Sequence, residues 1–219
     1  MKIKGVIFDL DGTILDSTWV WGQIDIDFLA KYGFDVPADY VEAIAAMGFG
    51  EAAKYTIERF QLKQSAEEVM KEWNDMAMEA YTNRVSLKEG TKELLQWLKQ
   101  EGIVFGVATS NNDSLFAPCL KRNGVYEMFH SFTESSEVKR GKDFPDIYIK
   151  EAEKLGCRPE ECVVFEDIIP ALKAASSGGF ITIGVREVAR GYEEEEFAGA
   201  CDYVITEISD ALSLLKKLK

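Results

Sequence analysis

The feature that most constrains the fold is a series of short apolar runs separated by helical patterns. The clearest runs, rich in β-branched or aromatic residues, are 4–10 (KGVIFDL), 103–109 (IVFGVAT), 162–167 (CVVFED) and 180–185 (FITIGV), with weaker ones at 128–133 and 202–206. Such runs are typical of strands buried on both faces, as in a parallel sheet covered by helices. Helices, each followed by glycine, are expected at 91–101, 143–155 and 170–177. The pattern predicts a doubly wound α/β sheet.

One stretch interrupts this alternation. Between the first and second expected strands there is only helical periodicity, for roughly seventy residues, which is far more than a crossover needs. Ser65 and Glu68 have the spacing of a capping box, and Val69, Trp73, Met76 and Ala80 then fall on one helix face. We therefore expect an α/β core formed by residues 1–16 and 87–219, with an all-helical subdomain inserted at 17–86.

The composition limits which classes of binding partner and which cellular location are expected. A formal net charge of −13 argues against a nucleic-acid partner, which would need clustered lysine and arginine. The four cysteines have no CxxC spacing, so we expect reduced core thiols. The apolar run in MKIKGVIFDL is too short for a signal peptide or a membrane span, and no run of the required length occurs later. We expect a cytoplasmic protein with no membrane partner.

Two aspartates follow the first expected strand, in the sequence VIFDLDGTILDS. Asp9 and Asp11 are two residues apart, so their side chains project the same way if strand geometry persists. Gly12 would let the backbone approach a ligand closely, and Thr13 adds a hydroxyl group. The stretch is either a solvated strand end or a place for a positively charged ligand.

A second acidic pair, Glu166 and Asp167, ends another expected strand. Parallel strands put both pairs at the same edge of the sheet, where open α/β sheets bind ligands. Up to four carboxylates there would repel one another unless a cation neutralised them. Oxygen ligands without histidine or cysteine favour Mg²⁺ over zinc or copper. The only histidine, His130, is expected to be a strand or loop residue.

The other strand ends carry side chains that suit a phosphate group. Thr109, Ser110 and Asn111 offer hydrogen bonds to phosphate oxygens, although such a run is usually a turn or a helix cap. Lys142 can balance a phosphate or a carboxylate as a point charge. Together with the carboxylates, these residues describe a phosphoryl-transfer site.

Four segments in order along the chain resemble the haloacid dehalogenase superfamily of the phosphatase type. DLDGT resembles its motif one, VATSN motif two, GKDFPDIY motif three and VFEDIIPALKAASSGG motif four. The helical insertion resembles the cap of the subgroup that contains β-phosphoglucomutase and phosphoglycolate phosphatase. The resemblance implies a Rossmann-like core, a helical cap and hydrolysis of a small phosphorylated metabolite.

The resemblance also implies roles for individual residues. Asp9 would attack phosphorus and form an aspartyl-phosphate, Asp11 would serve as acid and then as base, and Lys142 would stabilise the charged intermediate. Mg²⁺ would be held by the Asp9 side chain, the Asp11 carbonyl and Asp167, supported by Glu166. The residues expected around the phosphoryl group are Gly12, Thr13, Thr109, Ser110 and Asn111.

The chain departs from the family pattern at three places. Ile168 and Ala171 stand in motif four where the family often has serine and glycine, which puts the shape of that loop in doubt. Asp143 replaces the usual proline of motif three and adds a negative charge beside Lys142.

Three other functions fit the sequence less well than a phosphatase, and one further motif match lacks its structural context. A haloacid dehalogenase would not need Asp11, and a phosphomutase would favour DGV over the DGT found here. A binding protein without catalysis should have lost at least one of the residues expected to act, and none is missing. The GxGxxA match in GFGEAA, at 48–53, follows a helical pattern rather than a strand, so we expect a loop between two helices there.

The inserted subdomain is expected to set specificity. Residues there that could face a substrate, or could equally be core or surface, are Trp19, Trp21, Met47, Phe49, Lys54 and Tyr55. The run EEEE at 193–196 is expected to be a solvated loop or a helix start. The substrate and the oligomeric state have no signature in the sequence.

Overall fold

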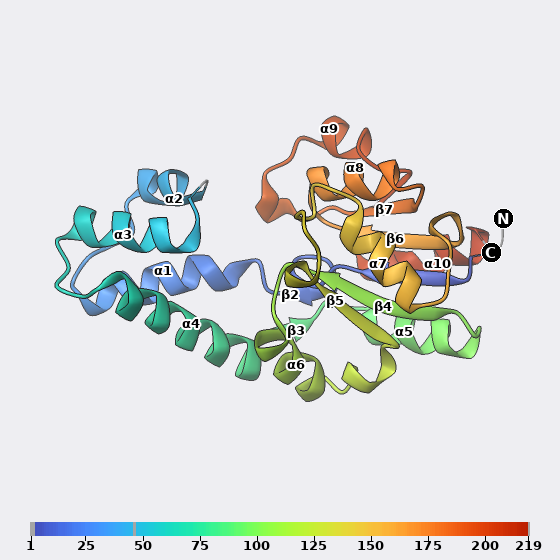
Figure 1. Cartoon of the computed structure of the whole chain (residues 1–219), viewed down its shortest axis with the longest axis horizontal. Helices are drawn as coiled ribbons and strands as arrows, with labels where there is room; N and C mark the ends of the chain where they lie inside the picture. Colours follow the sequence, from blue (N-terminus) through green and yellow to red (C-terminus); the bar gives the residue numbers. More distant parts are fainter. Residues whose placement is uncertain (1–2, 46, 219) are drawn as a thin grey trace. The chain divides into compact units, whose positions relative to one another are not determined.

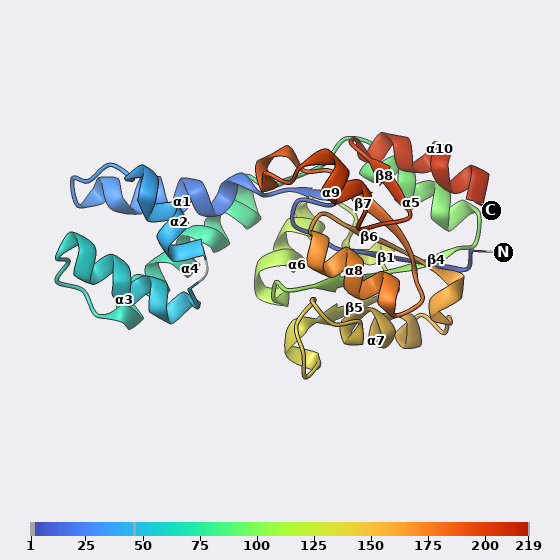
Figure 2. The same ribbon diagram turned by 90° about the horizontal axis from the view of Figure 1, so that it is seen from above.

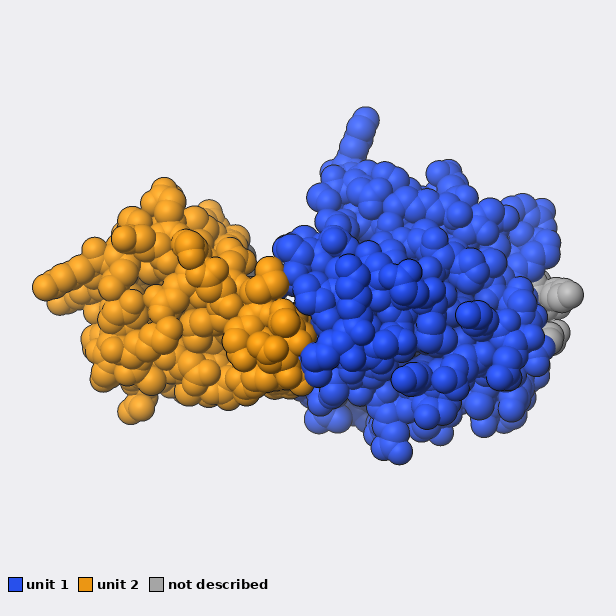
Figure 3. Space-filling view, turned by 90° about the horizontal axis from the view of Figure 1, so that it is seen from below, with its two compact units in different colours: residues 1–17, 85–219 blue, residues 18–84 orange. Residues whose placement is uncertain are grey.

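A computed structural model describes residues 3–45 and 47–218 and divides the chain into two compact units. Unit 1 comprises Met1–Ser17 and Val85–Lys219, and unit 2 comprises Thr18–Arg84 (Figure 3). Among the described residues, no helix combines the length and the apolar character needed to cross a bilayer. All four cysteines are free thiols, but only Cys119 and Cys162 are buried as core thiols, whereas Cys157 and Cys201 are half-buried.

A six-stranded parallel sheet forms the centre of unit 1 (Figure 1). In sheet order the strands are β5 (Ser131–Glu134), β4 (Val104–Thr109), β1 (Gly5–Phe8), β6 (Cys162–Glu166), β7 (Ile181–Val185) and β8 (Tyr203–Ile205). Every residue of β1 and β6 is buried, which is why both were visible as unbroken apolar runs. The prediction of a doubly wound α/β core is confirmed.

Helices cover both faces of this sheet. They are α5 (Thr91–Gln100), α6 (Asp113–Arg122), α7 (Asp146–Lys154), α8 (Ile169–Ser177), α9 (Glu194–Ala198) and α10 (Ile208–Leu218), with short 3₁₀ turns η1 (Tyr126–Met128), η2 (Ser135–Glu137), η3 (Pro159–Glu161) and η4 (Val188–Arg190). Helices α5 and α10 pack together on one face, and α7 and α8 cover the other (Figure 2). The core beneath α7 and α8 includes Ile7, Ile147, Val164 and Ala171.

The helix expected at 143–155 begins later than predicted. Helix α7 starts at Asp146, because Phe144 donates its N–H to Gly141 in a turn and Pro145 takes the N-cap position. The acidic run at 193–196 is a helix start: Glu193 is the N-cap of α9, and the next three glutamates form its first turn. Carboxylates are favourable there because the helix dipole is positive at that end.

The strand register determines which side chains meet at the carboxyl edge of the sheet. Phe8 of β1 pairs with Phe165 of β6 and with Val107 of β4. The residues that follow, Asp9 and Glu166, are therefore level with each other on neighbouring strands.

The chain leaves and re-enters unit 1 through a small antiparallel pair. Strand β2 (Leu15–Asp16) pairs with β3 (Ser86–Leu87), so Leu15 lies opposite Leu87 and Asp16 opposite Ser86. The exit and the return of the chain are thereby held together within unit 1.

The described residues of unit 2 form helices joined by loops, with no strand among them. Its elements are α1 (Trp19–Lys31), α2 (Ala38–Ala45), α3 (Phe49–Phe60) and α4 (Ala66–Asn83). The predicted capping box is present, because the Ser65 hydroxyl accepts from the Glu68 N–H at 3.2 Å and the Glu68 carboxylate accepts from the Ser65 N–H at 2.7 Å. The buried ring of Phe28 and the exposed ring of Phe49 both pack edge-to-face on Trp73.

The loop predicted at 48–53 is wrong. These residues form the N-cap and the first turns of α3, with Gly48 as the N-cap. The Gly48 carbonyl accepts from the N–H groups of Glu51 and Ala52, and the Glu51 side chain accepts from the Gly48 N–H. The glycine that suggested a loop is therefore a helix cap.

Candidate active site

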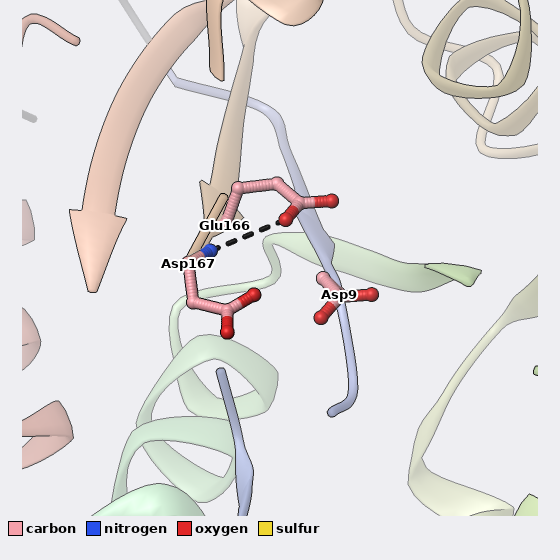
Figure 4. Close-up of side chains that lie close together, drawn as sticks. All are labelled: Asp9, Glu166 and Asp167. Atoms are coloured by element: carbon pink, nitrogen blue, oxygen red, sulfur yellow. Dashed lines mark hydrogen bonds between the residues drawn. The ribbon is translucent and has the colours of Figure 1, made fainter. Parts of the chain in front are cut away.

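Three carboxylates meet at the carboxyl ends of β1 and β6. Asp9 follows β1, Glu166 ends β6 and Asp167 comes next. One oxygen of each lies within 4.8 Å of the others, and all three residues are buried. Figure 4 shows the side chains gathered around a common space, with the Asp167 N–H donating to Glu166. Buried like charges at this spacing need positive partners.

Lys142 supplies one of those positive charges. It lies in the loop before α7, is buried, and donates from Nζ to both Asp9 and Glu166. Burial alone would lower the pKa of Lys142, but the two carboxylates outweigh it and hold that pKa well above its usual range. Tyr148 of α7 donates its hydroxyl to the same Glu166 oxygen at 2.7 Å.

The carboxylates remain short of positive charge. Burial, with the charges of Asp9 and Asp167 adding to it, raises the pKa of Glu166 to about 8 although Lys142 opposes the shift. Burial and then the Asp9 charge raise the pKa of Asp167 to about 6 although Arg190 opposes it. Strongly perturbed acids gathered at a strand end are typical of a functional site.

The donor set fits a divalent cation. The Oδ1 atom of Asp167 is buried and has no hydrogen-bond partner within the part of the chain that the structure describes. A buried carboxylate oxygen without a donor is costly, and two further carboxylates lie beside it. Three carboxylates without histidine or cysteine suit a hard cation such as Mg²⁺.

The DGT sequence forms a tight turn after β1. The N–H groups of Thr13, Ile14 and Leu15 all point at the Leu10 carbonyl, at 3.2, 3.0 and 2.8 Å. Gly12 has φ +83, which only glycine adopts without strain. The Thr13 hydroxyl donates to Asp9 Oδ2 at 3.2 Å, so the turn also positions the carboxylate of Asp9.

Asp11 has hydrogen-bond donors on both oxygens. Ser17 donates to Oδ1 at 2.7 Å and the Asn111 amide donates to Oδ2 at 3.2 Å. The structure thus brings together residues from the turn after β1 and from the loop after β4. Ser17 was not singled out from the sequence.

Thr109 and Ser110 are also at the carboxyl end of β4. The Thr109 hydroxyl is buried and accepts from the Asn111 N–H at 3.0 Å. Ser110 is exposed and accepts from the Ser135 hydroxyl at 3.3 Å. These bonds position the loop rather than the three carboxylates, and the phosphate-binding roles of this loop remain predictions.

Arg190 was also missed, and it is the second cation of the site. Its Nε donates to Asp167 Oδ2 at 2.6 Å, and its Nη2 donates to the Asp11 carbonyl at 3.3 Å. Arg190 lies on η4, outside every quoted motif, so no local signal marks it. Tyr148, by contrast, ends the quoted GKDFPDIY segment and could have been found there.

The six residues proposed for specificity all lie in unit 2. The exposed rings of Trp21 and Phe49 meet edge-to-face at 5.8 Å, and Lys54 is exposed. Arg84 lies over the ring of Trp19, at 4.6 Å from its centroid. The others, Met47 and Tyr55, are half-buried. Their part in substrate selection stays a prediction.

Comparison with known proteins identifies a matching family and several relatives. The profile of the family described as haloacid dehalogenase-like hydrolase matches residues 6–185. The chain is 27% identical over 177 residues to the phosphorylated carbohydrates phosphatase of Thermotoga maritima, covering 81% of this chain and 82% of that protein. It is 30% identical over 198 residues to the β-phosphoglucomutase of Bacillus subtilis, covering 84% and 83%.

Solved structures also match the fold of this chain. A Thermotoga maritima protein described as a candidate β-phosphoglucomutase matches with a TM-score of 0.88 at 25% identity, over 99% of this chain and 100% of that one. One relative is much longer: the bifunctional riboflavin kinase/FMN phosphatase of Arabidopsis thaliana is 27% identical over 206 residues, and the chain spans 53% of its length.

Proposed function

The chain belongs to the haloacid dehalogenase-like hydrolase family, and we propose that it is a Mg²⁺-dependent phosphatase acting through an aspartyl-phosphate. Its substrate would be a small phosphorylated metabolite of the cytoplasm, selected by residues of unit 2. The observation that carries the proposal is the buried cluster of Asp9, Glu166 and Asp167, in which Lys142 contacts both Asp9 and Glu166.

Asp9 is the proposed nucleophile. A carboxylate oxygen of Asp9 forms a bond to phosphorus while the bond from phosphorus to the ester oxygen breaks. Lys142 and the Thr13 hydroxyl each contact one oxygen of Asp9, so the carboxylate is oriented before substrate arrives.

Asp11 is the proposed acid and base. It gives a proton to the leaving ester oxygen in the first step, and it takes a proton from the attacking water in the second. That water forms the new bond to phosphorus, the bond to Asp9 breaks, and inorganic phosphate leaves. The donors Ser17 and Asn111 hold Asp11 in a defined rotamer between the two steps.

Mg²⁺ would be held by the side chains of Asp9 and Asp167, with Glu166 beside them and the Asp11 carbonyl as a further oxygen ligand. When bound, it supplies positive charge that offsets the charge of the phosphoryl group. Lys142 provides the remaining positive charge next to Asp9.

Phosphomutase activity is the second candidate, because two proteins similar to this chain are described as β-phosphoglucomutases. Mutase and phosphatase share the two aspartates and differ in what accepts the phosphoryl group. Threonine in the DGT sequence favours transfer to water. A mutase would isomerise a sugar monophosphate when a sugar bisphosphate is added, whereas a phosphatase would release phosphate.

The test is phosphate release by the purified chain from p-nitrophenyl phosphate and from a panel of phosphorylated metabolites, with Mg²⁺ or with EDTA. We expect turnover that requires Mg²⁺ and that falls at least about a thousandfold in Asp9→Asn. Asp210→Asn, the same substitution at an exposed position of α10, is the matched control and should be unaffected. Full turnover by Asp9→Asn, or no release from any substrate, would refute the proposal.

A further inference from the structure

Arg190 donates hydrogen bonds to two oxygen-bearing groups that the proposed function assigns to the metal as ligands. Its guanidinium makes a charged hydrogen bond to Asp167 Oδ2 at 2.6 Å and reaches the Asp11 carbonyl at 3.3 Å. These two groups lie on different parts of the chain, one after β6 and one in the turn after β1. The arginine therefore binds the same pair of oxygen donors that would bind Mg²⁺.

We propose that Arg190 is the resident counter-cation of the metal-free site, and that Mg²⁺ binds by displacing its guanidinium from Asp167 and the Asp11 carbonyl. The inference rests on the proposed function for the identity of the metal. It means that Arg190, which lies outside every quoted motif, lowers the affinity of the site for the metal.

The charges explain why a resident cation is needed. Asp167 is fully buried, and Lys142 contacts Asp9 and Glu166 instead. Without Arg190, the Asp167 carboxylate would be a buried charge with no ion-pair partner among the described residues, which is strongly destabilising. The arginine thus stabilises the folded chain whenever metal is absent.

The same charges explain why the two cations compete. A guanidinium and a divalent ion on one buried carboxylate would place three positive charges within a few ångströms, where screening by solvent is weak. Asp167 Oδ1 has no hydrogen-bond partner among the described residues, so it would offer the metal a ligand oxygen while Arg190 holds Oδ2. Repulsion then favours release of the arginine.

The segment that carries Arg190 is anchored independently of it. The Glu187 carboxylate accepts from the Ala189 N–H at 3.3 Å and from Lys88 Nζ at 2.6 Å, and Lys88 also donates to the Gly12 carbonyl at 2.5 Å. The Arg190 side chain is 33% exposed, so it has a route to solvent. Its release requires rotation of one side chain while η4 keeps its place.

The experiment measures Mg²⁺ affinity of the full-length chain by isothermal titration calorimetry after removal of metal with EDTA. Arg190→Met keeps the apolar stem and removes the charge, and we expect it to bind Mg²⁺ roughly tenfold more tightly. Arg186→Met is the matched control, because Arg186 lies at the start of the same loop but pairs with the exposed Glu194 at 3.2 Å. Its affinity should equal that of the unmodified chain.

Thermal unfolding gives a second readout with the opposite sign. In EDTA, Arg190→Met should melt at a lower temperature than the unmodified chain, because Asp167 is left unpaired. At saturating Mg²⁺ this deficit should disappear. A third readout is the ¹⁵N signal of the Arg190 Nε–H group, assigned by its loss in Arg190→Met, whose exchange with water should accelerate as Mg²⁺ is added.

The outcomes separate this inference from the proposed function. Equal or weaker Mg²⁺ binding by Arg190→Met would overturn the inference, since Arg190 would then be neutral or would orient Asp167 for the metal. Binding by Arg190→Met alone would support it. If neither chain binds Mg²⁺, the metal-dependent function fails and the inference fails with it.

Discussion

A single methyl group added at Gly106 would test how the sheet is held to α7, the helix that follows the Lys142 loop. A Cβ at this position of β4 would lie 1.7 Å from Glu151 Oε1 and 2.9 Å from the Ser131 carbonyl oxygen. The Glu151 carboxylate is buried and accepts from the hydroxyls of Ser131 and Thr133. Gly106→Ala must therefore expel that carboxylate from its place.

The expected loss follows from these contacts. Two hydrogen bonds to a charged group contribute about 1.5–3 kcal/mol each, and forcing a methyl group against the backbone adds about 1–3 kcal/mol. Release of Glu151 offsets part of this, because burial already raises the pKa of its carboxyl and so disfavours the ionised form. We expect Gly106→Ala to lower the free energy of unfolding by about 3–5 kcal/mol.

Urea unfolding followed by circular dichroism measures this loss, and a double-mutant cycle identifies its cause. If the clash with Glu151 is the main cause, Gly106→Ala should add only about 1–3 kcal/mol in the Glu151→Ala background, where the Ser131 carbonyl is the one close contact left of the three nearest. Gly22→Ala is the matched control, because no atom lies within 4 Å of the added methyl group and alanine favours helix α1. A loss below about 1 kcal/mol for Gly106→Ala, or additive losses in the double variant, would refute the reasoning.

Three other substitutions test single features. Burial raises the pKa of Asp25 on α1 to about 6, so the folded chain binds this proton more tightly than the unfolded chain does. The stability of the fold therefore falls as the pH rises from about 4 to about 6. Asp25→Asn should therefore raise the melting temperature at pH 7 and leave it unchanged at pH 3; equal effects at both would contradict this. Ser65→Ala removes the cap of α4 and should cost about 1 kcal/mol in urea unfolding, whereas Ser213→Ala inside α10 should not. Tyr148→Phe removes a donor from the buried Glu166 and should cost about 1–2 kcal/mol in EDTA; no loss would mean that the bond is not stabilising.

The centre of the sheet could be predicted because strands β1 and β6 are buried on both faces. A strand that is buried on both faces is an unbroken apolar run without polar alternation, so β1 and β6 could be recognised from the sequence. Helix ends were less predictable, because they depend on individual caps. Pro145 shortened α7 at its start, and Gly48 began a helix where its glycine suggested a loop.

The meeting of Asp9 with Glu166 and Asp167 was also predictable. It needs only that two parallel strands end at the same edge, and β1 and β6 turned out to be direct neighbours. The order of the strands itself was not predictable, because parallel strands far apart in sequence are paired by the whole fold.

The counter-charges show where prediction from sequence stops. Lys142 was found because it lies in a recognisable segment, and its two ion pairs follow from the path of that segment to α7. Arg190 reaches Asp167 only because β7 lies beside β6 and the chain after β7 turns back over the same edge. A carboxylate cluster can thus be predicted from spacing, but the cations that make it tolerable are contributed by loops whose positions depend on the assembled sheet. In this chain the unpredicted cation, Arg190, contacts the same two groups that would bind a metal, the Asp167 carboxylate and the Asp11 carbonyl. The affinity for Mg²⁺ would therefore depend on a residue outside every motif.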